Sequence, residues 1–398
     1  MRTLAVAAGS QSARFAFLFG AAFFLLGVHL PFFPVWLEAR GYGAGQISLA
    51  VAVGFIGRIV MGPLIAHYAQ AAPDPRKPIL ALAMATLLFF AFLPPLGAFW
   101  TILALGSLAI WFFSTLIPLA DVMAMQAQRA GEVDYGRMRA FGSVAFIVAS
   151  LMAGWLKDWG GPETIMGAIL VSGGVLVLAS ATLKRPPVAE APPKPIAWSE
   201  TLDLAARPAF LVFLLAGGVI QASHGVYYAF SSIHWSKIGY SDPTIGMLWG
   251  VGVAAEVAFL AFSGPIVARL GPARLLALAG AAATLRWGAT AFDPPLGLLI
   301  LLQALHALSF AATHVASVSF VVRASPERLA GAAMTLTAST GFGLAVGLAA
   351  LTAGGLYSAY GAGSYLSMAA LGAAGLVGAL ALGRMWSGET LGPRPAPA

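Results

Sequence analysis

The sequence predicts an all-α membrane protein in which twelve transmembrane helices form two pseudosymmetric six-helix bundles. Three observations predict this class: few charges, long apolar runs and an internal repeat. Of the 398 residues, 59% are hydrophobic and 9% are charged, whereas about 25% of the residues of a soluble domain are charged. Most stretches between short charged or Pro/Gly-rich breaks are apolar over about 20 residues, the length a helix needs to cross a bilayer. The composition therefore excludes an ordinary soluble globular protein.

Breaks in the apolar pattern define the individual helices. The first apolar run is too long for the hydrophobic region of a signal peptide and lacks a convincing cleavage site, so we predict that it is a span. The twelve predicted spans lie near residues 14–37, 44–68, 77–97, 99–126, 137–156, 163–183, 208–236, 243–268, 273–292, 296–322, 328–356 and 361–385.

The distribution of Lys and Arg predicts the orientation of the chain. With a cytoplasmic N-terminus, the inner loops and tails hold 17 of the 22 cationic residues, and the outer loops hold Arg40, Lys157 and Lys237. The remaining two, Arg58 and Arg286, fall within spans. Because cationic loops stay in the cytoplasm, we expect a multi-pass protein of a bacterial-type inner (plasma) membrane with both termini cytoplasmic. The net charge of +7 then faces an anionic membrane surface, so no nucleic-acid partner is expected.

A Pro-rich segment and an internal repeat divide the chain into halves. Residues 184–207 include KRPPVAEAPPKP, a linker composition, between an N-terminal bundle (1–183) and a C-terminal bundle (208–398). A shift of 198 residues aligns the first span with the seventh. The aligned identities are Gly27/Gly225, Val28/Val226, Phe32/Phe230, Gly41/Gly239, Tyr42/Tyr240, Ile47/Ile245, Val53/Val251 and Gly54/Gly252. Two parallel six-helix halves joined by a linker resemble the major facilitator superfamily, whose substrate site lies near the midplane between the halves.

Charged residues inside the spans are the first candidate functional residues. A charge at the centre of a bilayer costs about 2.5 to 3.5 kcal/mol, so each should face the interior of a bundle and have a partner. Arg58 and Glu256 are equivalent in the repeat, each about halfway along its span. Glu256 is the first candidate proton carrier, because burial favours the protonated carboxyl and a nearby Arg favours the ionised one. A static Arg58–Glu256 ion pair is the alternative.

Three further residues join Glu256 as candidates for proton coupling. Arg286 and His306 are expected at similar depth in neighbouring spans, so a cluster with Glu256 in the C-terminal half is geometrically reasonable. His314 follows His306 by eight residues, about 80° around an α-helix, so both rings can border one cavity. For either His, a packed and hydrogen-bonded core role is the alternative.

Aromatic and His side chains recur near the outer ends of the first and seventh spans. His29 begins HLPFF, and the prolines at 31 and 34 interrupt the helical hydrogen bonds there. At the equivalent place the seventh span carries His224, Tyr227, Tyr228 and Phe230. These side chains could stack on an aromatic ligand and hydrogen-bond its polar group; an interfacial aromatic belt is the alternative.

Asp121 lies in the inner half of the fourth span, shortly before Arg137 and Arg139 at the start of the fifth. A carboxylate–Arg pair there could clamp a cytoplasmic gate or form part of the substrate site. We favour the gate and structural role.

Several strings, taken in order and in the matching spans, resemble one family over nearly the whole chain. They are LPFFPVWL, PLAD, DYGRMRAFGSVAF, SHGVYYAFSSIHW, GVAAEV, LRWG and LQALHALSFAATH. They resemble the phenylpropionate permease family of the major facilitator superfamily, proton symporters related distantly to lactose permease and nucleoside symporters. The resemblance implies import of an aromatic carboxylate, such as 3-phenylpropionate, together with protons.

The resemblance also suggests where such a substrate would bind. Its aryl group would contact the aromatic side chains of the seventh span together with Phe32 and Trp249. Its carboxylate would contact Arg58 or Arg286. The carboxylate, Arg and His of the C-terminal half are similar to the coupling residues of lactose permease, although here the carboxylate lies on the eighth span. The predicted substrate-binding residues are Arg58, His29, Phe32, His224, Tyr227, Tyr228, Phe230 and Trp249.

Other functions fit the sequence less well. A proton-coupled sugar or nucleoside symporter could use the same charged cluster, but Asn and Gln are scarce in the fourth and tenth spans. Drug efflux and a membrane sensor without transport are further alternatives. An enzyme, a metal site or another cofactor is not expected, since HExxH, GxSxG and Cys do not occur. The expected partners are a small-molecule substrate, protons and the bilayer, with the protein as a monomer.

Overall fold

The computed structural model describes residues 10–70, 72, 74–184 and 198–392, and over these ranges the regular elements are helices, with no strand. Nine helical runs within the described ranges are long and apolar enough to cross a membrane. The all-α class predicted from composition is therefore confirmed. The chain divides into two compact units: Met1–Pro192 with Ser231–Gly250, and Pro193–Phe230 with Val251–Ala398.

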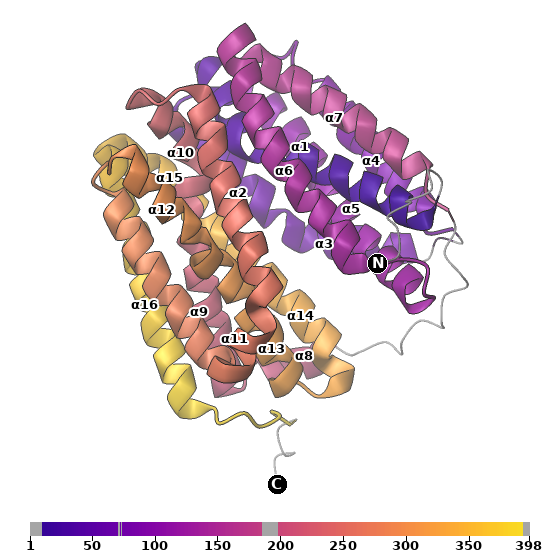
Figure 1. The fold of residues 1–398 in the computed structure, drawn as a ribbon, viewed down its shortest axis with the longest axis vertical. Helices are drawn as coiled ribbons and strands as arrows, with labels where there is room; N and C mark the ends of the chain where they lie inside the picture. Colours follow the sequence, from indigo (N-terminus) through magenta and orange to yellow (C-terminus); the bar gives the residue numbers. More distant parts are fainter. Residues whose placement is uncertain (1–9, 71, 73, 185–197, 393–398) are drawn as a thin grey trace, which may run out of the picture. The chain divides into compact units, whose positions relative to one another are not determined.

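The first unit is built around α1. In this unit α1 packs against α6 and α7, and α5 packs against α4, as Figure 1 shows for the indigo to magenta helices. Its helices are α1 (Gln11–Ala39), α2 (Ala44–Ile56), α3 (Arg58–Gln70), α4 (Arg76–Ala91), α5 (Phe99–Arg129), α6 (Tyr135–Gly160) and α7 (Glu163–Ala181).

The helix α1 shows how sequence sets this packing. Ser10 begins it by accepting a hydrogen bond from the main-chain N–H of Ala13 at 3.2 Å. Gly27 lets α1 approach α6, because a Cβ at this position would lie 2.6 Å from the main-chain oxygen of Phe146. In lipid there is no hydrophobic driving force between helices. Small residues at such crossings let the backbones approach closely, and van der Waals packing then stabilises the contact.

A hairpin from the second half of the sequence also belongs to the first unit. It joins the end of α10 (Gly225–Lys237) to the start of α11 (Asp242–Thr290) and docks on α6. Lys157 donates to both carboxylate oxygens of Asp242 at 2.6 Å, and the two side chains are only 13% and 14% exposed. At Gly154 an added Cβ would overlap the carbonyl of Asp242, so the main chains nearly touch. Such a shielded ion pair keeps more of its strength than an exposed one.

The second unit is organised around α9 (Pro208–Ala222). This helix packs against α16, α13, α15 and η3, and Figure 1 shows α16 in yellow alongside it. The other elements are α8 (Trp198–Ala205), α12 (Leu296–Ala304), η1 (Ala307–Ala311), α13 (Ala312–Ala324), η2 (Glu327–Leu329), α14 (Ala330–Ala338), η3 (Ser339–Ala345), α15 (Val346–Tyr360), η4 (Gly361–Ser364) and α16 (Tyr365–Met385).

One helix boundary agrees with the sequence prediction, and another differs from it. The predicted spans 243–268 and 273–292 lie on the two sides of Gly271, where α11 is interrupted by a kink with φ 69° and ψ 168°. A left-handed φ suits glycine, so the chain turns there while the helices on both sides continue. Within the predicted linker 184–207, residues 198–205 form α8, whose Glu200 pairs with Arg328. Residues 185–197 of that linker lie outside the described residues.

We predict that Gly154→Leu destabilises the protein, because the new side chain would meet the main chain of Asp242 and Pro243. Forcing packed helices apart costs about 1 to 3 kcal/mol. Gly167→Leu on α7 is the matched control, since nothing lies within 4 Å of a Cβ there. Thermal unfolding in detergent should give a lower Tm for Gly154→Leu than for the control. Equal values would contradict the close docking of the hairpin on α6.

Candidate functional site

Arg286 is the centre of a buried polar cluster in the second unit. It lies on the second part of α11 and is fully buried. One terminal nitrogen donates to Nδ1 of His306 at 3.0 Å and to Oγ of Ser309 at 3.2 Å. The other donates to Oε1 of Gln303 at 2.8 Å. The guanidinium is therefore held against the segment that runs from α12 into η1.

These hydrogen bonds define the protonation of the His306 ring. An Arg side chain only donates, so Nδ1 of His306 accepts and the proton of the neutral ring lies on Nε2. That Nε2 is 3.9 Å from a carboxylate oxygen of Glu256, whose side chain is 25% exposed. The structure thus brings together Glu256, Arg286 and His306, with the imidazole between the two charged groups.

A second chain of hydrogen bonds leads from Arg286 to His224. Oγ of Ser309 is 3.4 Å from Nε2 of His224, and Nδ1 of His224 is 3.2 Å from the main-chain oxygen of Gln221. A carbonyl only accepts, so Nδ1 of His224 carries the proton and Nε2 accepts from the Ser309 hydroxyl. Ser309 accepts from Arg286 and donates to His224. The two histidines therefore have opposite tautomers.

Aromatic rings surround this cluster. The guanidinium carbon of Arg286 is 4.1 Å from the centroid of Trp287 and 4.9 Å from that of Tyr227. Trp287 meets His224 edge to face at 5.2 Å between centroids, and Phe310 stacks on His306 at 4.8 Å. Such rings attract the cation but supply no negative charge.

The break between α9 and α10 presents these rings. Ser223 follows α9, and its Oγ accepts a hydrogen bond from Nε1 of Trp287 at 3.0 Å. Gly225 begins α10, where an added Cβ would lie 2.8 Å from the main chain of Ala349. The turn at Ser223 and His224 is thereby fixed to α11 on one side and to α15 on the other.

Within the described residues, the hydrogen-bond partners of Arg286 are neutral side chains. No Asp or Glu in the described part of the chain pairs with it. The amide nitrogen of Gln303 is buried and makes no hydrogen bond within that same part. Because burying an uncompensated charge costs several kcal/mol, this site favours an added anion.

The other C-terminal candidates fall into two groups. Tyr228 and Phe230 are buried with Tyr227, and Phe230 stacks on Tyr357 with centroids 4.5 Å apart. His314 is exposed on α13. The segment between His306 and His314 is the π-helix η1, so the α-helical angle expected between them does not apply.

The first unit holds the remaining predicted substrate residues. The guanidinium of Arg58 lies over the ring of Phe55 at 4.7 Å, and His29 stacks on Phe33 at 4.7 Å. Phe32 is buried. Trp249 is also buried, and its Nε1 donates to Oγ of Ser232 at 2.9 Å within the docked hairpin.

Asp121 is paired with one of its two predicted Arg partners. Its Oδ1 accepts from the Tyr135 hydroxyl at 3.0 Å and lies 3.7 Å from Nε of Arg139. Arg137 instead pairs with Asp134 at 3.1 Å on the exposed start of α6. Arg139 thus ties the start of α6 to α5.

Sequence reasoning missed three residues that contact Arg286. Gln303, Ser309 and Trp287 occur within strings used for the family resemblance, but none received a role. A Gln three residues before a His in an apolar span was a usable signal, because a buried amide needs a partner. The hydrogen bond between Ser309 and Arg286 depends on the π-helix η1, and no pattern in the sequence indicated it.

Comparisons with known proteins agree with this architecture. The model of the "MFS_1 like family" matches residues 13–368. The "Probable 3-phenylpropionic acid transporter" of Escherichia coli (strain K12) is 33% identical over 75% of this chain and 79% of that protein. The "Maltose permease" of Geobacillus stearothermophilus is 27% identical over 87% and 88%. The solved structure of the nucleoside transporter NupG matches with a TM-score of 0.78 at 17% identity, over 95% of this chain and 99% of that one.

We predict that ¹⁵N NMR of His-labelled protein in detergent at neutral pH shows opposite tautomers for His224 and His306. His224 should carry its proton on Nδ1 and His306 on Nε2, because their partners are a carbonyl and a guanidinium. Single His→Gln variants assign the signals, and exposed His314 serves as the control. An Nδ1–H on His306 would contradict the bond to Arg286.

Proposed function

Because the chain belongs to the MFS_1 like family of transporters, we propose that it is a secondary active transporter that imports a small aromatic carboxylate with protons by alternating access. A 3-phenylpropionate-like acid is the proposed substrate. The proposal agrees with the printed name of the relative at 33% identity.

The observation that carries the substrate class is the buried guanidinium of Arg286. Its neutral partners leave the positive charge uncompensated within the described residues. A substrate carboxylate would supply that charge through charge-assisted hydrogen bonds. Trp287 and Tyr227 lie beside the guanidinium and are the proposed contacts of the aryl group. The proposed site thus combines a cation for the carboxylate with aromatic residues for the aryl group.

The tautomer of His306 supports a coupling mechanism. A proton arriving on Nδ1 of His306 would replace the hydrogen bond that this atom accepts from Arg286, since both groups would then donate. One guanidinium N–H would become free to bind a carboxylate. Glu256, 3.9 Å from the already protonated Nε2, is the proposed proton carrier, and its carboxylate would stabilise the resulting imidazolium. Protonation and anion binding would therefore favour each other.

The first unit supplies the remaining proposed roles. Arg58, His29, Phe32 and Trp249 are proposed to contact the substrate during the transport cycle. Asp121 and Arg139 are proposed as a gate or structural pair.

The proposed topology has twelve spans with both termini in the cytoplasm of a bacterial-type inner membrane. Two of the nine helical runs, Asp242–Thr290 and Glu327–Met385, contain 49 and 59 residues. Each is long enough for two crossings at about 20 residues per crossing. Counting both runs twice and adding the 16-residue α4 gives twelve. A monomer is the proposed oligomeric state.

A sugar or nucleoside symporter is the competing proposal, supported by the names of the maltose and nucleoside relatives. The uncompensated charge of Arg286 favours an anionic substrate over these neutral ones.

We predict that 3-phenylpropionate raises the Tm of the purified protein, whereas the neutral 3-phenylpropanol does so much less. The carboxylate alone can compensate Arg286, and a charged hydrogen bond contributes about 1.5 to 3 kcal/mol, roughly 10- to 100-fold in affinity. Arg286→Gln should remove the difference between acid and alcohol. Arg274→Gln, at an exposed position of the same helix run, is the matched control. Equal shifts by both compounds, or shifts by maltose or uridine alone, would overturn the carboxylate assignment.

We predict that Glu256→Gln proteoliposomes exchange labelled 3-phenylpropionate but do not accumulate it in response to an inward proton gradient. The amide cannot carry a proton, while the anion site at Arg286 stays intact. Wild type and Arg274→Gln should both accumulate substrate. Gradient-driven accumulation by Glu256→Gln equal to that of wild type would contradict its role as the proton carrier.

A further inference from the structure

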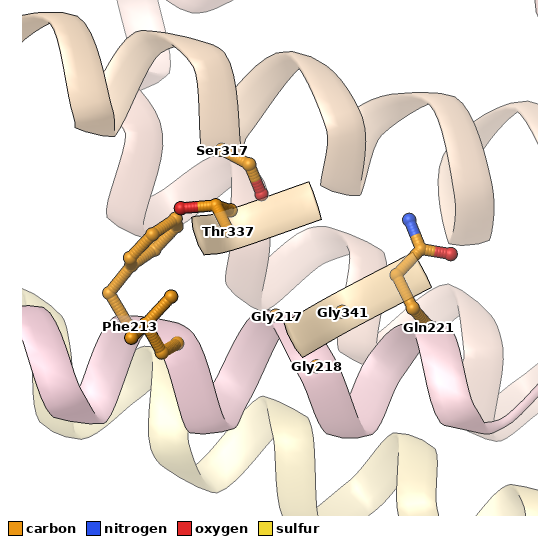
Figure 2. A pocket seen from close by; sticks show the side chains of 8 residues that line it. Phe213, Gly217, Gly218, Gln221, Ser317, Thr337 and Gly341 are labelled. Atoms are coloured by element: carbon orange, nitrogen blue, oxygen red, sulfur yellow. The ribbon is translucent and has the colours of Figure 1, made fainter. Parts of the chain in front are cut away.

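A small cavity lies beside α9, one turn from His224 and outside the Arg286 cluster. Residues of α9, α13, α14 and η3 line it (Figure 2), and its volume of about 10 Å³ is about what one water needs. The lining includes Gly217, Gly218, Gln221, Ser317, Thr337 and Gly341.

Gln221 is the unusual member of this lining. It is 2% exposed, and neither its amide oxygen nor its amide nitrogen has a hydrogen-bond partner in the described chain. Figure 2 shows its side chain rising from α9 at one end of the cavity, with Ser317 and Thr337 toward the other end. A buried amide with two unmet groups costs about 1 to 3 kcal/mol for each group, so an occupant is needed.

The hydroxyl groups across the cavity determine what that occupant can be. Ser317 donates to the main-chain oxygen of Thr313, and Thr337 donates to that of Ala333, each at 2.8 Å. Both hydroxyl oxygens are left as acceptors. A water molecule can accept from the amide nitrogen of Gln221 and donate to its oxygen or to a hydroxyl.

A cation is a poorer occupant. It would find oxygen ligands, but none of the eight lining residues is charged, and an uncompensated buried charge is costly. We propose that this cavity is a binding site for one ordered water molecule, held by Gln221 and shared with the Ser317 and Thr337 hydroxyls. Gln221 also accepts from Nδ1 of His224 through its main-chain oxygen.

The test is the sign of a stability change, and it does not depend on the proposed function. Gln221→Met keeps the side-chain length and removes both amide groups. If the water is bound, this variant loses its hydrogen bonds and its Tm falls by about 1 to 3 °C. In a dry cavity the same change would remove an unsatisfied amide, and Tm would rise or stay unchanged. Leu215→Met, exposed on the same helix, is the control.

A double-mutant cycle identifies the shared occupant. Thr337→Val removes one hydroxyl at constant shape, and its effect on Tm should add less than fully to that of Gln221→Met. If Gln221→Met fails to fold, the cycle between Ser317→Ala and Thr337→Val tests the same water. Full additivity would overturn the proposal. A cation in the site would also overturn the proposal. In that case the Tm of the wild type would differ between sodium and potassium at equal ionic strength, and Gln221→Met would lose this difference.

Discussion

In the described part of the chain, Arg286 is buried among neutral hydrogen-bond partners, and its guanidinium sets the order of donors and acceptors around it. Hydrocarbon offers no hydrogen bonds, so every polar atom around Arg286 must be satisfied by the protein or by a ligand. Gln303, His306 and Ser309 all turn acceptor atoms toward it. Two of these partners contact further residues: His306 lies near Glu256, and Ser309 lies near His224. The aromatic rings attract the guanidinium but supply no negative charge, so an anion would still be needed to compensate it.

In the proposed mechanism, anion binding and protonation are linked through one side chain, His306. His306 can bond Arg286 through Nδ1 only while that atom is unprotonated. A proton on this nitrogen and a carboxylate on the guanidinium are therefore compatible, whereas either alone leaves a less favourable arrangement. A transporter needs such a linkage if the movement of one ligand is to depend on the other. The linkage requires only a local exchange of hydrogen bonds.

Much of this arrangement follows from the sequence, and the exceptions have physical causes. The all-α class follows from apolar runs with few charges, and the proximity of Glu256, Arg286 and His306 from similar depths on neighbouring spans. The angle around the helix between His306 and His314 could not be predicted, because a π-helical segment changes the helical phase after His306. Gln303 and Ser309 are polar residues of a common kind whose importance appears only when the buried Arg is in place. The docking of the 231–250 hairpin on α6 depends on Gly154 and Lys157, which are far from it in sequence.

The central claim is that the anion missing beside Arg286 is the carboxylate of the substrate. The most direct measurement is an experimental structure of the protein with 3-phenylpropionate bound at pH values where the acid is ionised. We predict that its carboxylate lies within hydrogen-bond distance of the Arg286 guanidinium and replaces the contact with Nδ1 of His306. A ligand bound elsewhere, with Arg286 still bonded to Gln303, His306 and Ser309, would contradict the account.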